Sequence, residues 1–371
     1  MPTVFDPIDL AGRRLANRIV MAPMSRSRAY GPAACPGPST VLYYAQRAGA
    51  GLIVSEGIQP TAAARGYDAT PGLHTDAQVA AWRAVTGAVH DAGGTIFAQL
   101  MHAGRIGLPS LLPEGARPVG PSPVTAAASI FTKQGPQPCV LPRELTESEI
   151  RATIQDYASA ARNAVAAGFD GVELHAANGF LVHQFLSDNA NLREDAWGGS
   201  VAGRIRFALE SLDALVAAVG ADRVGLQISP GNPYNDITES DVHAVYPALV
   251  GALEGSGLAY LSVAEGRDRE LTLRLREKWS GAFMLNPYTA ARPTGLEDLR
   301  LVEDGTADLL SFGSMFLANP DLPRRLARGG PFNTPDPATY YGGSDHGYTD
   351  YPSLDDPGEP GGARSPASAP S

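Results

Sequence analysis

Two polar residues three positions apart, His175 and Asn178, have the types and spacing that suit a carbonyl-binding pair. Both side chains offer hydrogen-bond donors, and a tight turn would aim the two donors at one point. Converging donors polarise a carbonyl group and stabilise the charge that develops on its oxygen. A lone histidine could instead satisfy a neighbouring backbone group. Because Asn178 accompanies His175 at the end of an apolar run, we expect the pair to be catalytic.

Metal and nucleophilic chemistry find less support in this sequence. A metallohydrolase needs several His and Asp ligands that converge on one ion. His175 has no such neighbour at its own strand end, and we expect His183 on a downstream turn. Ser25 and Ser314 have no evident base, and the G-x-S-x-G motif of serine hydrolases is absent. We therefore expect no metal and no serine nucleophile.

The elements that must position the pair follow a regular alternation of short apolar runs and longer amphipathic segments. Runs of this length suit parallel strands buried on both faces. Eight such units in a row imply a (β/α)8 TIM barrel, an α/β fold. The alternative is a doubly wound sheet, whose dinucleotide form would show G-x-G-x-x-G, and that motif is absent. The expected strands are residues 18–22, 52–56, 95–100, 171–175, 224–229, 259–263, 282–286 and 309–313, and the expected helices are 40–50, 76–92, 148–167, 203–219, 239–254, 271–279, 295–304 and 320–328.

Helix boundaries carry their own signals. Three pairs match capping boxes or close variants, namely Thr75 with Gln78, Thr146 with Glu149 and Thr238 with Asp241. In such a barrel the active site lies where the strands end. The residues delivered there are Pro23, Met24, Ser25, Gly57, Gln99, His175, Asn178, Phe180, Gln227, Glu265, Asn286, Gly313 and Ser314.

Glycine and proline, 41 and 31 of the 371 residues, are more frequent than usual and demand many turns. Residues 104–145, between the third strand and its helix, are rich in both and too long for an ordinary connection. We interpret them as a lid over the barrel mouth, which should shape the substrate site together with the region around Tyr340 and Tyr341. Residues 355–371 consist almost wholly of small residues, proline and aspartate, so we expect a disordered tail. The domain prediction is one barrel over residues 1–354.

Charge and cysteine content exclude several classes of partner. A net charge of −10 disfavours nucleic acid, because few cations are free to neutralise phosphates. No apolar stretch is long enough to span a membrane. Two cysteines make no disulfide framework, and the first ten residues lack the features of a secretory signal. We therefore expect a cytoplasmic protein that acts on a small molecule.

From Val4 to about Leu354 the sequence resembles the Old Yellow Enzyme family, in its bacterial classical subgroup. The resemblance implies a (β/α)8 ene-reductase in which FMN, recharged by NAD(P)H, gives a hydride to the β-carbon of an enone. It also leaves room for a homodimer. The segments that carry it are residues 17–24, 44–48, 55–57, 99–105, 169–179, 318–322 and 347–352.

The resemblance also implies roles for single residues. His175 and Asn178 would hold the carbonyl oxygen, and Gln99 would pair with the pyrimidine edge of the flavin. The turn after the first strand would lie along the flavin, with Ser25 near its O4 atom. The other expected cofactor positions are Pro23, Met24, Gly57, Gln227, Asn286, Gly313 and Ser314.

Four positions depart from the family pattern. Phe180 replaces a tyrosine that protonates the α-carbon, and phenylalanine has no exchangeable proton. Gln227 and Ser314 replace arginines near the flavin ring and phosphate, and Pro287 has no N–H to offer a phosphate. Each hydrogen bond to a charged group that is lost is worth about 1.5–3 kcal/mol, so these departures predict weaker FMN binding. Arg292, Arg324 or backbone amides near Gly313 could supply compensating hydrogen bonds.

Two functions of different kinds follow. The first is an FMN-mediated, NAD(P)H-dependent ene-reductase of secondary metabolism with altered proton delivery. The second is a redox-neutral, FMN-free isomerase or cyclase that uses the same carbonyl-polarising pair. We adopt the first, because compensation at cofactor positions is common. A non-catalytic binding protein is disfavoured, because His175 and Asn178 are intact.

Overall fold

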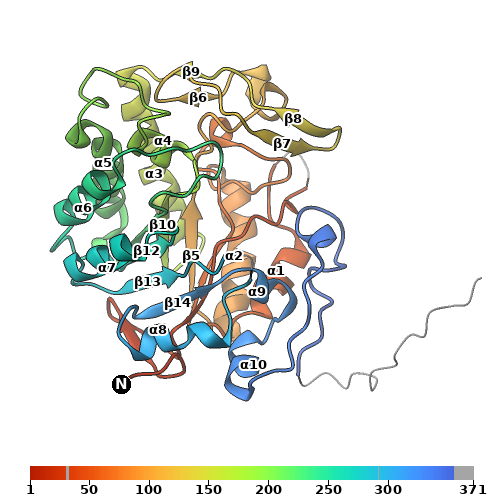
Figure 1. Cartoon of the computed structure of the whole chain (residues 1–371). Helices are drawn as coiled ribbons and strands as arrows, with labels where there is room; N and C mark the ends of the chain where they lie inside the picture. Colours follow the sequence, from red (N-terminus) through yellow and green to blue (C-terminus); the bar gives the residue numbers. More distant parts are fainter. Residues whose placement is uncertain (31–32, 291, 355–371) are drawn as a thin grey trace, which may run out of the picture.

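The computed structural model describes residues 1–30, 33–290 and 292–354 (Figure 1). Eight parallel strands pair in chain order and close on themselves, which confirms the predicted barrel. Every expected strand is present, with bounds within two residues of the prediction. The strands are β3 (Ile19–Met21), β4 (Leu52–Val54), β5 (Ile96–Leu100), β10 (Gly171–Ala176), β11 (Val224–Ile228), β12 (Tyr260–Ala264), β13 (Phe283–Asn286) and β14 (Leu309–Phe312).

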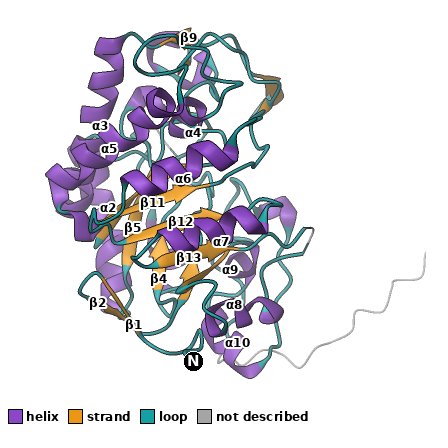
Figure 2. Ribbon diagram, turned by 60° about the vertical axis from the view of Figure 1, so that its left-hand side comes forward, coloured by secondary structure: helices purple, strands orange, loops and turns teal. Residues whose placement is uncertain are grey.

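Helices surround the strands, as the two views show (Figures 1 and 2). The apolar faces of the helices and strands meet in one large buried cluster, because strands covered on both sides must be apolar throughout. The main helices are α1 (Pro38–Ala45), α2 (Asp76–Asp91), α3 (Glu147–Ala166), α5 (Val201–Val219), α6 (Val242–Ala252), α7 (Arg269–Lys278) and α10 (Leu322–Arg328).

Short helical elements were missed or misjudged. The helix expected at 295–304 is a 3₁₀ turn, Leu296–Asp298, followed by one turn of α8 (Arg300–Glu303). Two short helices, α4 (Leu181–Leu186) and α9 (Ser314–Ala318), were not predicted. His183 lies inside α4 rather than on a turn, so that prediction was wrong. Elements of four to six residues have too few turns to show a helical period.

The capping predictions held at two sites and failed at one. Thr75 with Gln78, and Thr146 with Glu149, make both reciprocal bonds of a capping box. α6 begins instead at Val242, and its N-cap, Asp241, makes no side-chain capping bond. The carboxylate of Asp241 pairs with the buried guanidinium of Arg204. A buried cation needs a partner more than a solvated helix end does.

The two ends of the barrel differ. A hairpin of β1 (Ile8–Leu10) and β2 (Arg13–Leu15) packs Leu10 and Leu15 on side chains inside the barrel, where the strands begin. This hairpin closes that end and leaves the other end for a site.

No helix in the described part of the chain is long and apolar enough to cross a membrane.

The insertion at residues 104–145 contains regular structure of its own. β6 (Val119–Gly120) pairs with β9 (Arg143–Glu144), and β7 (Ser129–Thr132) forms a hairpin with β8 (Gly135–Pro138). These short strands gather at the top of Figure 1. Side chains of the β7–β8 hairpin line the cavity described below, so part of the insertion borders the barrel mouth. The predicted tail, 355–371, lies outside the described residues.

Candidate active site

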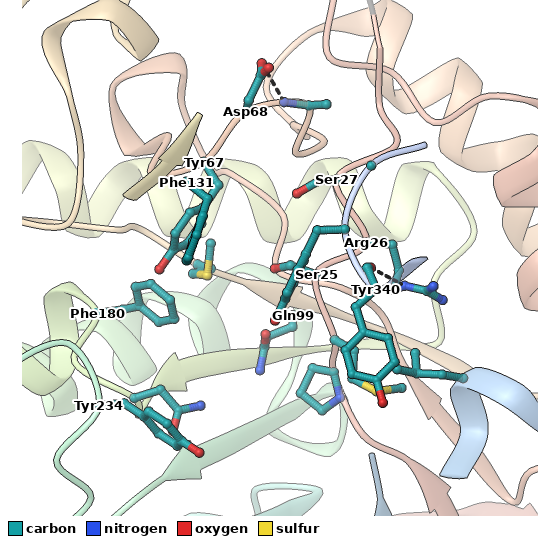
Figure 3. A pocket seen from close by; sticks show the side chains of 18 of the residues that line it. Ser25, Arg26, Ser27, Tyr67, Asp68, Gln99, Phe131, Phe180, Tyr234 and Tyr340 are labelled. Carbon is teal, nitrogen blue, oxygen red and sulfur yellow. Dashed lines mark hydrogen bonds between the residues drawn. The ribbon is translucent and has the colours of Figure 1, made fainter. Parts of the chain in front are cut away.

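A cavity of about 970 Å³ opens where the barrel strands end (Figure 3). The loop after β3, the ends of β5 and β10, and the start of α9 all contribute to its wall. Its size suits a cofactor together with a drug-sized ligand. Nine of the twelve predicted catalytic and cofactor residues line it: Pro23, Met24, Ser25, Gln99, His175, Asn178, Phe180, Gly313 and Ser314.

The other three predicted residues lie behind this wall. Gly57 packs against the side chain of Met101. A Cβ at position 57 would lie only 2.7 Å from the Met101 sulfur, so a larger residue would collide with it. The side-chain oxygen of Gln227 accepts a hydrogen bond from Gln99 Nε2 at 3.1 Å. The amide of Asn286 donates to the carbonyl of Ser311 in the next strand. These three residues contact side chains or backbone near the cavity but do not line it themselves.

His175 is buried at the end of β10, with its ring 4.9 Å from that of Phe180. Burial, together with the nearby His183, lowers the pKa of His175 to about 3, so its imidazole is neutral at neutral pH. Its Nδ1 atom is buried and has no hydrogen-bond partner among the described residues. An unpaired buried polar atom is costly unless a ligand satisfies it. His175 therefore has the chemistry of a ligand-binding group.

Asn178 reaches the cavity from a tight turn between β10 and α4. Its φ of +54° and that of Gly179, +77°, are both left-handed. A Cβ at position 179 would lie 2.5 Å from the carbonyl oxygen of Tyr234, so only glycine fits there. The Asn178 carbonyl accepts a hydrogen bond from Asn235 Nδ2 at 2.7 Å. The turn thus places Asn178 beside His175 on the cavity wall.

Sequence reasoning missed a buried carboxylate beneath Gln99. Glu173 Oε1 accepts from Gln99 Nε2 at 2.9 Å, and burial raises the pKa of Glu173 to about 7 despite that bond. This pair fixes the Gln99 amide at the cavity floor. The available signal was a charged residue inside the apolar run at 171–176. A charge in such a run has a partner or a function.

Aromatic side chains from segments far apart in the sequence form the cavity rim. Tyr67 follows β4, Phe131 lies on β7, Tyr234 follows β11, and Tyr340 lies in the C-terminal segment (Figure 3). Arg26 draws that segment to the rim, because its guanidinium donates to the carbonyls of Thr339, Tyr340 and Gly347. Apart from Tyr340, these rim residues were not predicted, because loop aromatics show no periodicity.

The cavity can hold a flavin ring. Pro23, Met24, Ser25 and Gln99 line it together, which leaves His175 and Asn178 for a substrate. Arg26 and Lys133 are the cationic side chains among the described residues that line the cavity. Arg292, expected to compensate at the phosphate, is held by Asp298 in a two-pronged ion pair at 2.6 and 2.8 Å and does not line the cavity. The weaker FMN binding expected from sequence stays a prediction.

Two buried histidines make stability depend on pH. Burial lowers the pKa of His102 to about 4 and that of His175 to about 3, whereas both are near 6.5 in an unfolded chain. The unfolded state therefore binds more protons below pH 6.5, and the folded state loses stability as the pH falls. We expect a loss of about 2 kcal/mol per histidine between pH 7.5 and pH 5. Urea unfolding of wild type and His102→Gln at both values tests this, and an equal loss in both proteins would contradict it.

Comparisons with known proteins agree on one family. Residues 3–333 match the NADH:flavin oxidoreductase / NADH oxidase family. Over 358 residues the chain is 41% identical to a probable flavin mononucleotide-dependent alkene reductase of Leishmania infantum, covering 94% of this chain and 96% of that protein. Chanoclavine-I aldehyde reductase fgaOx3 of Penicillium roqueforti (strain FM164) is 44% identical over 370 residues, which cover 95% of this chain and 96% of that protein.

A solved structure supports the same assignment. Morphinone reductase in complex with tetrahydroNAD superposes with a TM-score of 0.90 at 41% identity, covering 96% of this chain and 99% of that one. The predicted resemblance is therefore confirmed, as are FMN and a nicotinamide reductant. The chain belongs to the NADH:flavin oxidoreductase / NADH oxidase family.

Proposed function

We propose that this protein reduces the carbon–carbon double bond of an α,β-unsaturated carbonyl compound, with His175 and Asn178 holding the carbonyl oxygen. The observation that carries the proposal is the unpaired, buried nitrogen of His175 beside Asn178 in a cavity large enough for both FMN and substrate. Similarity to an alkene reductase and to morphinone reductase supports the same chemistry. Similarity to chanoclavine-I aldehyde reductase supports a role in secondary metabolism.

The chain's own residues would act on the substrate as follows. Pro23, Met24 and Ser25 would hold FMN, which would supply the hydride for the β-carbon. His175 and Asn178 donate hydrogen bonds to the carbonyl oxygen, which makes the β-carbon electrophilic and stabilises the charge that develops on that oxygen. The α-carbon then needs one proton to complete the saturated product.

Phe180 cannot supply that proton, and we infer that Tyr67 does. The two rings meet edge to face with centroids 6.2 Å apart, and both line the cavity (Figure 3). Tyr67 is held in place locally, because its carbonyl accepts from Arg65 and from Thr70. Burial raises the pKa of Tyr67 to about 12, so it carries its proton at neutral pH. Water would return the proton to the phenolate after each turnover.

Optical titration of the purified holoenzyme tests the function. We expect a yellow protein that NADH bleaches without oxygen and that 2-cyclohexenone then recolours, with one saturated ketone formed per flavin. NADH bleaching without recolouring would contradict ene-reduction and leave the flavoprotein assignment intact. A rearranged enone formed without NADH would favour the redox-neutral alternative, which the reductase relatives do not support.

The same proposal extends to the protein's organisation and setting. We infer one domain over residues 1–354, with 104–145 as its lid, and a cytoplasmic enzyme whose partner is a small enone rather than nucleic acid or a membrane. The net charge of −10 supports the exclusion of nucleic acid. The family resemblance leaves room for a homodimer, and light scattering of the holoenzyme would measure the mass that decides between monomer and dimer.

A further inference from the structure

We propose that His183, Tyr246 and Glu239 form a hydrogen-bond relay that positions Asn178 by holding the backbone of its turn. The proposal rests on the proposed function only for its kinetic readout. Its first link is direct: the Gly179 N–H donates to His183 Nδ1 at 3.0 Å. The adjacent Asn178 N–H donates to Ser229 Oγ at 2.8 Å, and that hydroxyl lies 3.5 Å from the same His183 nitrogen.

The first link fixes the tautomer of His183. Because Nδ1 accepts from a backbone N–H, a ring hydrogen of His183 is on Nε2. Nε2 lies 3.0 Å from the hydroxyl oxygen of Tyr246 and donates to it. The Tyr246 hydroxyl in turn donates to Glu239 Oε1 at 2.7 Å. The direction of each bond in the relay therefore follows from the one before it, and Glu239 Oε2 also lies 3.4 Å from His183 Nε2.

The relay ends on a buried carboxylate that is itself anchored. Glu239 has a side chain only 2% exposed, and its Oε2 accepts from the Gly231 N–H at 2.9 Å. Burial alone would raise the pKa of Glu239, but the proximity of His183 and the hydrogen bonds from Tyr246 and the Gly231 N–H outweigh it and lower the pKa. The carboxylate is therefore charged at neutral pH. Hydrogen bonds to a charged acceptor are the stronger ones.

The turn needs such support. Asn178 and Gly179 are consecutive left-handed residues, a conformation that costs free energy for a residue with a Cβ. Two tethered N–H groups fix the turn, and with it the direction of the Asn178 side chain. The two tethers come from α4 and the loop after β11, and the rest of the relay comes from α6 and the segment before it. The relay thus joins the carbonyl-binding turn to the outer layer of the barrel.

None of the relay side chains lines the cavity, so their effect on substrate must pass through the turn. His183 and Tyr246 are fully buried. The nearest other charges, Arg204 and Asp241, pair with each other beside Tyr246. His183, Tyr246 and Glu239 are therefore positioning residues, and Asn178 is the group that touches the substrate.

Two substitutions at His183 separate positioning from general stability. His183→Leu removes the acceptor for the Gly179 N–H, whereas His183→Asn keeps an oxygen near the place of Nδ1 and cuts only the link to Tyr246. In the holoenzyme we expect His183→Leu to speed hydrogen–deuterium exchange of peptide 176–184 at least about tenfold. We also expect KM for the enone to rise about tenfold, a loss of about 1.4 kcal/mol in binding, with a smaller change in kcat. His183→Asn should restore part of both.

Tyr43→Phe is the matched control, because it removes a hydroxyl from an equally buried tyrosine in α1. FMN content should be unchanged in all three variants. Unchanged exchange in His183→Leu, or an equal change in Tyr43→Phe, would overturn the proposal. If exchange rises as expected while wild type reduces no enone, the relay stands and the proposed function fails.

Discussion

Replacing His175 by alanine will slow reduction of an enone by about a hundred- to a thousandfold, the usual cost of removing one donor from a developing oxyanion. The imidazole is neutral, so it stabilises the oxyanion by donating a hydrogen bond rather than by carrying a positive charge. The loss should fall on the reaction with enone alone. Reduced enzyme mixed with 2-cyclohexenone in a stopped-flow instrument measures that step directly.

Oxygen provides the internal control for this prediction. Dioxygen has no carbonyl group, so reoxidation of the reduced His175→Ala enzyme by air should keep the wild-type rate. His74→Ala serves as the matched variant, because His74 is a half-buried histidine that does not line the cavity. Enone reduction at the wild-type rate in His175→Ala would show that the carbonyl is held elsewhere.

Asn178 and His175 should act as one unit. Two donors that converge on one oxygen share the developing charge, so the double variant should lose less than the two single losses multiplied. A full multiplicative loss would place the two side chains on different atoms of the substrate.

The barrel could be predicted because its strands are buried on both faces. Largely apolar runs as short as 224–228 and 260–264 suit few structures besides a buried strand, and eight in order favour one closed topology. Nine of the predicted catalytic and cofactor residues line the cavity by the same rule, since the ends of the strands converge. The capping box expected at Asp241 failed for a different reason. Asp241 was assigned by local sequence, but it pairs with Arg204, 37 positions away, which only the folded chain brings near.

Other parts of the site had no sequence signal that could be used without coordinates. Tyr67, Tyr234 and Asn235 lie on loops, where no period reveals which way a side chain points. The relay from His183 to Glu239 crosses 56 positions of sequence, from α4 to the segment before α6, and depends on the tautomer of a single ring. Long-range hydrogen bonds of this kind depend on how the elements pack in three dimensions, which cannot be derived from a single sequence.

Tyr67→Phe should reduce enone turnover by about a hundredfold, the usual range for losing one general acid. The α-carbon would then be protonated only by water. The hydride and the proton enter different carbons, so the measured signature is a solvent isotope effect. We expect wild type to react more slowly in D2O when protonation limits the rate, and Tyr67→Phe to show a different isotope effect at its lower rate.

Phe180→Tyr tests the same prediction in the opposite direction, by adding a hydroxyl instead of removing one. A hydroxyl added to Phe180 would lie in the same part of the cavity, because the two rings already meet edge to face. In the Tyr67→Phe background it should restore most of the lost rate, whereas alone it should add little, since wild type already has a donor. Tyr30→Phe, which removes an exposed hydroxyl from the rim, is the matched control. An unchanged rate and isotope effect in Tyr67→Phe would assign the proton to water, and the cavity would then have to admit water beside the bound enone.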